Sequence, residues 1–352
     1  MSDQVRAVVV EAIRASGPIT FAEYMELALY GPGGFYERPP VGADGDFVTS
    51  PHVHPVFGRF LGEALRTLHA ALDAPSPFRL VEVGAGDGTL ARQVRDALED
   101  LALDYVAVEV SAGAREALAQ APGLRVASRL VEADLVLAHE LLDNLPFRVL
   151  RGEREVRIGL DADRLVELLA EPGEELAPFV RPGSREEILV PTGAFSFVEQ
   201  VAAALGDRGY ALLIDYGDEG TSGGQRHGYA GHRVVADLLA TPGGTDITAG
   251  VDFGLLADHA RACGLAAFPT VSQHDALMAL GFAEWFHGQL ATQHAQLDAR
   301  DGIGAVRTWA DKSRATLLAD PGGLGRFRWM VLATPGLPAP QWLTSRPSTD
   351  RP

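Results

Sequence analysis

The chain has 352 residues, which is enough for one large domain or two ordinary domains with a substantial core. Its formal net charge of −17 would repel nucleic acid and anionic membranes over most of the surface, so we expect neither as a partner. Cys263 is the only cysteine, which excludes an internal disulfide and a metal cluster built from several cysteines.

The N-terminus and the basic residues indicate a compartment and a source. The N-terminal segment contains Asp3 and Glu11 and has only a short apolar run, which is not typical of a signal or transit peptide. No apolar run approaches the roughly 18 residues that a transmembrane helix needs. We therefore expect a cytoplasmic protein. Lys312 is the only lysine among 30 lysines and arginines, a bias typical of GC-rich bacterial genomes.

The N-terminal part predicts helices and a binding loop. Helices are expected over 3–15 and 20–30, the second opening with a capping box formed by Thr20 and Glu23. Residues 31–55 are irregular and rich in glycine and proline, and so long a loop is typical of a lid, a binding loop or disorder. Residues 56–72 return to helical spacing of apolar side chains. We assign residues 1–75 to an N-terminal helical cap with this binding loop.

From residue 76 onward, predicted strands and helices alternate, which indicates an α/β fold with a doubly wound, Rossmann-like parallel sheet. Short apolar runs between 147 and 192 predict an inserted antiparallel segment. The catalytic domain is therefore expected to comprise 76–146 and 193–334, and the proline-containing residues 335–352 are expected to form a flexible tail. Strands are predicted at 78–83, 104–110, 124–127, 134–138, 209–214, 266–271 and 326–333, helices at 88–100, 111–120, 195–205 and 252–263, and a glycine-dense loop at 217–244.

The first predicted strand of this domain leads into a glycine-rich turn. It ends at Glu82, and Gly84, Gly86 and Gly88 follow at alternate positions. Glycine lets the backbone turn tightly and approach a ligand closely. Position 89 is threonine, whereas a dinucleotide fingerprint needs its third glycine there, which disfavours a dehydrogenase. The E-x-G-x-G-x-G form resembles motif I of class I S-adenosylmethionine (SAM) methyltransferases, which implies SAM as the cofactor.

Carboxylates follow the other predicted strands. Glu109 ends the next strand, where it can accept hydrogen bonds from a ribose diol. His139, Glu140 and Asp143 follow strand 134–138 and should face the same crevice, because ligands of such sheets lie at the carboxyl ends of the strands. Glu140 and Asp143 share one face of a helical turn, so we consider all three residues candidate catalytic groups. A solvated helix start explains the two acids as well.

Two further expectations concern the same crevice. Asp215 is another candidate, although an Asx turn explains it almost equally well. Methyl transfer from a sulfonium requires mainly alignment and exclusion of water, and the histidines near the crevice show no ligand spacing, so we expect no metal.

Four separate stretches resemble the MidA / DUF185 family of SAM-dependent methyltransferases, which includes a mitochondrial complex I assembly factor that methylates an arginine. The stretches are Ile19–Met25, Gly45–Pro51, Ala138–Pro146 and Asp246–Phe253. The resemblance implies a class I SAM-methyltransferase fold and an acceptor bound near Glu140 and Asp143. The cofactor contacts that it implies are Glu82, Gly84, Gly86, Gly88 and Glu109, with Asp46, Thr49 and Ser50 from the binding loop. Tyr229, Asp246 and Thr248 are candidates on this resemblance alone.

The predicted function is SAM-dependent methylation of a protein or peptide side chain, with an arginine nitrogen as the leading acceptor. Paired carboxylates would bind the guanidinium through two hydrogen bonds. The chain departs from the family at His52, where a glutamate is usual, and at His227, where an arginine is usual, so the acceptor stays open. A small-molecule methyltransferase and a SAM-binding assembly factor with little catalysis are the alternatives, and a homodimer is one option for the oligomeric state.

Overall fold

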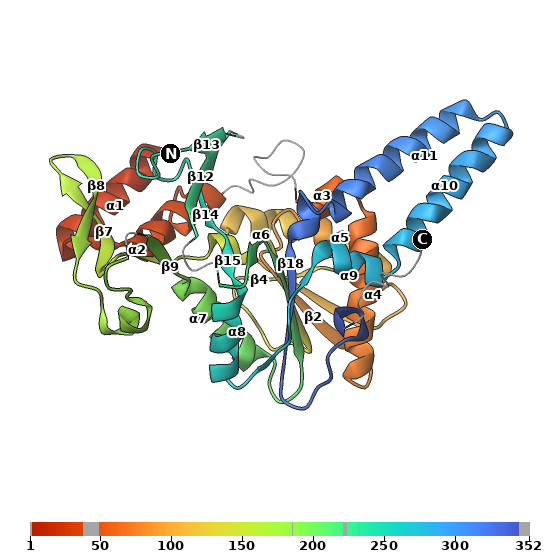
Figure 1. Cartoon of the computed structure of the whole chain (residues 1–352), viewed down its shortest axis with the longest axis horizontal. Helices are drawn as coiled ribbons and strands as arrows, with labels where there is room; N and C mark the ends of the chain where they lie inside the picture. The colour runs from red at the N-terminus through yellow and green to blue at the C-terminus, as the bar shows by residue number, and fades with distance from the viewer. Residues whose placement is uncertain (1, 38–48, 185, 221–223, 232, 345–352) are drawn as a thin grey trace.

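The computed structural model describes residues 2–37, 49–184, 186–220, 224–231 and 233–344. A central sheet of eight strands organises the chain (Figure 1). In spatial order its strands are β16 (Ala266–Ala267), β18 (Arg328–Ala333), β10 (Tyr210–Asp215), β5 (Leu135–His139), β2 (Phe78–Val83), β3 (Leu103–Val108) and β4 (Arg125–Ala127), with β17 (Val271–Ser272) also beside β18. The five strands from β10 to β4 are parallel, and β18 runs antiparallel to β10. The predicted doubly wound α/β fold is therefore confirmed.

Helices cover both faces of this sheet, because the strands bury apolar side chains on both sides. Leu80 and Leu137 belong to one core cluster, whereas Val81 and Val136 belong to the other, as the alternation along a strand requires. The first face is covered by α4 (Val56–Ala71), α5 (Thr89–Ala97), α9 (Gln273–Ala279) and the short α12 (Gln341–Thr344). The second face is covered by α7 (Thr192–Ala204) and α8 (Phe253–Ala262), and α6 (Ala112–Leu118) packs near β3 and β4.

The N-terminal helices and the inserted segment share one core. The cap contains α1 (Ser2–Ser16), β1 (Ile19–Thr20), α2 (Phe21–Met25), a π-helical turn (Glu26–Tyr30) and a 3-10 turn (Phe35–Glu37). The insert contains β6 (Arg148–Arg151), β7 (Arg154–Asp161), β8 (Arg164–Ala170), a 3-10 turn (Glu174–Phe179) and β9 (Glu187–Val190). All strand pairs of the insert are antiparallel, as predicted, and β1 adds to this sheet beside β7. The predicted capping box is present, with Glu23 N donating to Thr20 Oγ1 at 3.0 Å and Thr20 N donating to Glu23 Oε2 at 2.7 Å.

Three predicted boundaries differ from the structure. Helix α4 packs on the central sheet rather than on the cap, because Phe57 and Leu61 are buried against it. The glycine-dense region includes strands and joins two more that follow it, namely β11 (Gly217–Asp218), β12 (Arg226–Ala230), β13 (Arg233–Val235), β14 (Asp246–Ala249) and β15 (Val251–Asp252). The expectation of a flexible tail from residue 335 is wrong for 335–344, because Leu337 and Trp342 are buried in the main core. Residues 345–352 lie outside the described part of the chain.

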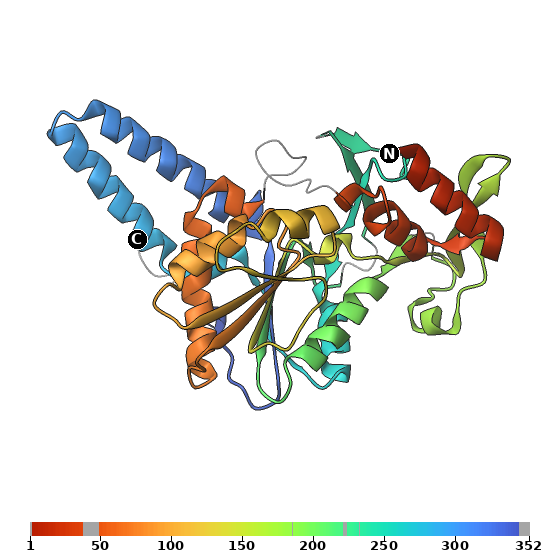
Figure 2. The same cartoon turned by 180° about the vertical axis from the view of Figure 1, so that it is seen from behind.

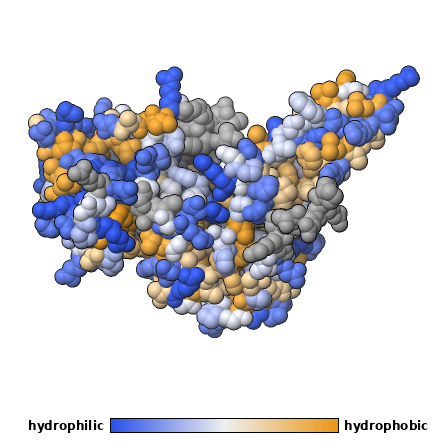
Figure 3. Space-filling view, in the orientation of Figure 1, coloured by the Kyte–Doolittle hydropathy of each residue, from blue (hydrophilic) through white to orange (hydrophobic). Residues whose placement is uncertain are grey.

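A helical hairpin projects from the sheet at the end opposite the cap (Figure 1 and Figure 2). It consists of α10 (Phe282–Asp298) and α11 (Gly302–Ala315), and apolar side chains such as Ile303 and Trp309 are exposed on it. Figure 3 shows apolar residues along this hairpin. The remaining short elements are α3 (Ser50–Val53) and 3-10 turns at Leu142–Asn144, Thr316–Ala319 and Leu324–Arg326. Among the described residues, no helix combines the length and the apolar character that crossing a bilayer requires.

Candidate active site

A cavity of about 720 Å³ lies at the carboxyl ends of β2, β3 and β5. The chain continues from β2 to β3 and β4 on one side and from β5 to β10 on the other, so the strand order reverses between β2 and β5. Ligands of open α/β sheets bind at such a reversal. The cavity has two halves, one formed by the glycine turn and the ends of β3 and β4, and the other by the cap, the end of β5 and β12–β14.

In the first half, Gly84, Gly86 and Glu109 line the cavity. Both glycines have positive φ, 77° and 54°, and a Cβ on Gly84 would lie 3.0 Å from Leu141 Cδ1. The Glu109 carboxylate accepts hydrogen bonds from Gly86 N at 3.1 Å and from Ser111 N at 3.1 Å. These bonds hold the carboxylate at the cavity edge, between the glycine turn and the end of β3.

Two predicted cofactor contacts stand behind the turn and do not line the cavity. Glu82 is 3% exposed and accepts a hydrogen bond from Tyr105 Oη at 2.7 Å, and its burial raises its pKa to about 8. Gly88 has φ 75° and precedes α5, where a Cβ would lie 2.7 Å from Leu118 Cδ2. In the structure both residues therefore lie behind the residues that line the cavity.

The binding loop reaches the cavity through Thr49. Ser50 is buried, and its N–H donates to Glu140 Oε1 at 3.2 Å. His52 connects the loop to the glycine turn, with Nδ1 2.8 Å from Thr49 Oγ1 and Nε2 3.0 Å from Asp87 Oδ2. Burial tends to raise the pKa of Asp87, but hydrogen bonds from His52 and from Thr89 lower it to about 2. Asp46 lies outside the described residues.

In the second half, Glu140 and Asp143 line the cavity together, as predicted. Glu140 has φ 52°, a sparsely populated conformation that the surrounding packing must enforce. Burial, with a contribution from the Asp215 charge, raises the pKa of Glu140 to about 8. Burial and the charges of Asp215 and Asp246 raise the pKa of Asp143 well above its ordinary value. The buried Asp143 Oδ1 accepts no hydrogen bond from the described residues. An unsatisfied acceptor of this kind is rare and fits a ligand that donates one.

His139 and Asp215 support this turn from behind. His139 is buried against Phe57, its burial lowers its pKa to about 3, and it does not line the cavity. Its Nε2 lies 3.3 Å from Glu140 Oε1 but makes no hydrogen bond to the described residues. Asp215 Oδ2 accepts hydrogen bonds from the backbone N–H groups of Leu141 at 3.1 Å, Leu142 at 2.7 Å and Asp143 at 3.3 Å. Asp215 thus fixes the backbone of the turn that follows β5.

Glu26, Tyr30 and Tyr36 of the cap also line the cavity, and sequence reasoning missed them. The Tyr30 and Tyr36 rings are stacked, with centroids 5.5 Å apart and planes 15° apart. The π-helical turn that carries Glu26 and Tyr30 has no sequence signature, although π-helical turns are frequent at functional sites. The one available signal was the aromatic, glycine-rich loop that directly follows this helix.

The residues that rested on the family resemblance also reach the cavity. Tyr229, Asp246 and Thr248 line it from β12 and β14. Asp246 Oδ1 accepts hydrogen bonds from Tyr36 Oη at 2.8 Å and Asn144 Nδ2 at 2.9 Å. Arg226 instead pairs with Glu187 at 2.9 Å and Glu167 at 2.8 Å and does not line the cavity.

Comparisons with known proteins agree with this geometry. A family model described as "Putative S-adenosyl-L-methionine-dependent methyltransferase" matches residues 60–271. The chain belongs to this family. It is 33% identical over 291 residues to mouse "Protein arginine methyltransferase NDUFAF7, mitochondrial" and 30% identical over 320 residues to the human protein of that name. These matches cover 69% and 76% of the chain, which spans 66% of the mouse relative and 71% of the human one.

A solved structure from the same comparisons extends over nearly the whole chain. A crystal structure of a Burkholderia thailandensis protein bound to S-adenosyl-homocysteine is 28% identical, has a TM-score of 0.79, and covers 98% of this chain and 95% of that one. Family membership makes SAM the cofactor, and the residues of this chain fit it. Gly84 and Gly86 line the cavity at positive φ, which lets the backbone turn beside a ligand, and the Glu109 carboxylate can accept the hydrogen bonds of a ribose.

Proposed function

We propose that this methyltransferase acts on an arginine side chain of a protein or peptide. The proposal rests on the second half of the cavity, which we call the acceptor half. In the described part of the chain, four carboxylates line it, from Glu26, Glu140, Asp143 and Asp246. They lie among tyrosine side chains and open onto the glycine turn. A planar cation with several donors matches such a set of acceptors, and the names of the mouse and human relatives support arginine within that class.

Each group has a defined part in binding. Asp143 Oδ1, which accepts no hydrogen bond from the described residues, receives one N–H of the guanidinium, and Glu140 receives another. The stacked rings of Tyr30 and Tyr36 provide an aromatic wall for the planar cation. Asp246 is held by Tyr36 and Asn144 and extends the acidic wall toward β14.

The raised pKa of Glu140 suits this carboxyl to accept the proton that the arginine nitrogen loses during methylation. Before the acceptor binds, the Glu140 carboxyl holds its proton at neutral pH, because burial raises its pKa to about 8. A guanidinium ion entering the cavity favours the ionised form, so Glu140 releases its proton when the acceptor binds. The carboxylate can then take the proton that the attacking nitrogen loses. SAM supplies a methyl group on a sulfonium, and the residues of this chain align the nitrogen behind it and exclude water.

We also propose that the protein acts in a bacterial cytoplasm. The bias toward arginine over lysine supports a bacterial source, and the single cysteine is compatible with a reducing cytoplasm. The names of the mouse and human relatives place those proteins in mitochondria.

The decisive experiment is acceptor identification in a lysate of a deletion strain. Purified protein and deuterated SAM are added, and labelled proteins and metabolites are read by mass spectrometry. The proposal expects deuterated methylarginine in one or a few proteins, lost with Glu140→Gln and retained with Glu153→Gln, an exposed residue outside the cavity. Label that appears only in metabolites would refute a protein acceptor and favour the small-molecule alternative. Absence of label from every acceptor would favour the assembly-factor alternative.

A further inference from the structure

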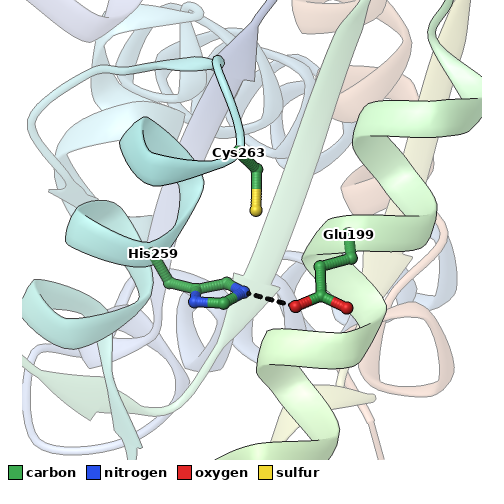
Figure 4. Close-up of side chains that lie close together, drawn as sticks. All are labelled: Glu199, His259 and Cys263. Carbon is green, nitrogen blue, oxygen red and sulfur yellow. Dashed lines mark ion pairs between the residues drawn. The ribbon is translucent and has the colours of Figure 1, made fainter.

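A second cluster of chemically active side chains lies on the outer face of α7 and α8. Figure 4 shows the Cys263 thiol, the His259 imidazole and the Glu199 carboxylate directed toward a common space. One ligand atom from each residue lies within 4.8 Å of the other two. Glu199 is on α7, His259 is in the last turn of α8, and Cys263 caps that helix. None of the three lines the active-site cavity.

The separation of one pair of ligand atoms is close to that in a zinc site. His259 and Cys263 are four residues apart, which places them on one face of the end of α8. Tetrahedral zinc with bonds of about 2.0 Å to nitrogen and oxygen separates two such ligand atoms by about 3.4 Å. His259 Nε2 and Glu199 Oε1 are 3.2 Å apart. Phe195 stacks on the His259 ring, with centroids 4.4 Å apart and planes 19° apart, and so fixes its direction.

The contacts in the cluster leave capacity for a ligand. Although the His259 and Glu199 atoms are close, they do not have hydrogen-bond geometry, and the buried His259 Nε2 has no hydrogen-bond partner in the described part of the chain. A thiolate, a carboxylate and a neutral imidazole carry two negative charges, which a divalent cation neutralises. Thiolate and imidazole together favour a borderline transition metal such as zinc over magnesium or calcium.

We propose that Glu199, His259 and Cys263 form a zinc-binding site that joins α7 to α8. The three side chains provide one oxygen, one nitrogen and one sulfur ligand, water completes the tetrahedron, and the thiol proton is released to solvent. The expectation of no metal rested on the needs of methyl transfer and on the histidines near the crevice, whereas this cluster lies outside the crevice. The packing of α7 against α8 brings Glu199 to His259 and Cys263. Phe197 and Gln200 of α7 line the active-site cavity, so the metal would brace a helix of that wall.

The test uses the full chain, freed of any affinity tag and stripped of metal with a chelator. Zinc is titrated against a chromophoric chelator, and cobalt is used as a spectroscopic probe. We expect one zinc per chain, and a thiolate-to-cobalt charge-transfer band. Glu199→Gln, His259→Ala and Cys263→Ser should each weaken zinc binding at least about tenfold, because a direct ligand matters at least as much as its outer-shell partners. His294→Ala, which removes an exposed histidine on α10, is the matched control and should bind zinc as the wild type does.

Thermal unfolding separates a metal site from a simple ion pair. Zinc should raise the Tm of the wild type and of His294→Ala but not of Cys263→Ser, because a ligand stabilises the state that binds it. Circular dichroism checks that each variant is folded. Equal zinc affinity in the wild type and in Cys263→Ser, or no zinc bound by the folded wild type, would overturn the proposal. Since the readouts are metal binding and Tm, the result does not depend on the methyl acceptor.

Discussion

Replacing Glu140 by glutamine should make the protein more stable at neutral pH while abolishing most of its turnover. Burial and the Asp215 charge raise the pKa of the native Glu140 carboxyl from 4.5 to about 8. Between these values the unfolded chain releases the proton and the native protein retains it. The free energy of unfolding therefore decreases as the pH rises through this interval. At about 1.4 kcal/mol per pKa unit, the loss at pH 7 is on the order of 3 kcal/mol.

Urea unfolding at a series of pH values measures this effect. Glutamine cannot ionise, so Glu140→Gln should match the wild type below about pH 4.5 and exceed it progressively up to about pH 8. The exposed control Glu153→Gln should follow the wild type throughout. In the same preparations Glu140→Gln should keep SAM affinity and lose on the order of 10²- to 10⁴-fold in kcat, the range for a general acid–base group. Parallel stability curves for Glu140→Gln and wild type would refute the raised pKa, and undiminished kcat would refute the catalytic role.

Three further predictions address the two halves of the cavity. Glu109→Ala should weaken SAM binding on the order of ten- to a hundredfold by calorimetry, because a charge-assisted hydrogen bond contributes about 1.5–3 kcal/mol. The control Glu116→Ala, which removes an exposed carboxylate on α6, should leave the SAM affinity unchanged. Equal SAM affinities in the wild type and in Glu109→Ala would remove Glu109 from the site. Gly84→Ala and Gly183→Ala should incur similar backbone strain, because the two glycines have φ of 77° and 76°. Gly183 has open space around it, so only Gly84→Ala should lose SAM affinity. A loss of SAM affinity in both variants would indicate a general effect on folding. With saturating SAM and an arginine peptide, kcat/KM should rise with pH up to about 8, where Glu140 loses its proton, and a profile independent of pH below that value would contradict its role.

The sheet and the cofactor half were predictable because their signals are local. Strand β2 is found at the predicted residues, since an apolar run bounded by a proline and a glycine turn admits few other structures. Glycines at alternate positions located the turn, and Glu109 followed from the next strand end. The same pattern could not show that Gly84 lines the cavity whereas Gly88 does not, or that Glu82 lies behind the turn. Those positions depend on which side chains of α6 and β3 pack beside them.

The acceptor half was predictable only in part because it is assembled from distant segments. Glu140 and Asp143 were found from their position after β5, and their shared cavity agrees with that reasoning. Tyr30 and Tyr36 belong to a helix and loop that, as sequence, look like ordinary core and turn residues. Trp342 was expected to lie in a flexible tail, because proline-rich composition conceals a side chain that is buried against the main core.

The pairing of Ile19 in β1 with Ile158 in β7 sets an order for building the enzyme. The glycine turn and Glu109 lie close together in the chain, so their contacts close short loops and can form early. The wall that carries Tyr30 and Tyr36 packs beside a sheet in which β1 pairs with β7, and strands β2 to β6 lie between these two in sequence. During synthesis on the ribosome, this half of the cavity cannot be completed until β7, and after it β12 and β14, have emerged. A nascent chain that ends before these strands contains the glycine turn and Glu109 but lacks part of the site for the molecule to be methylated.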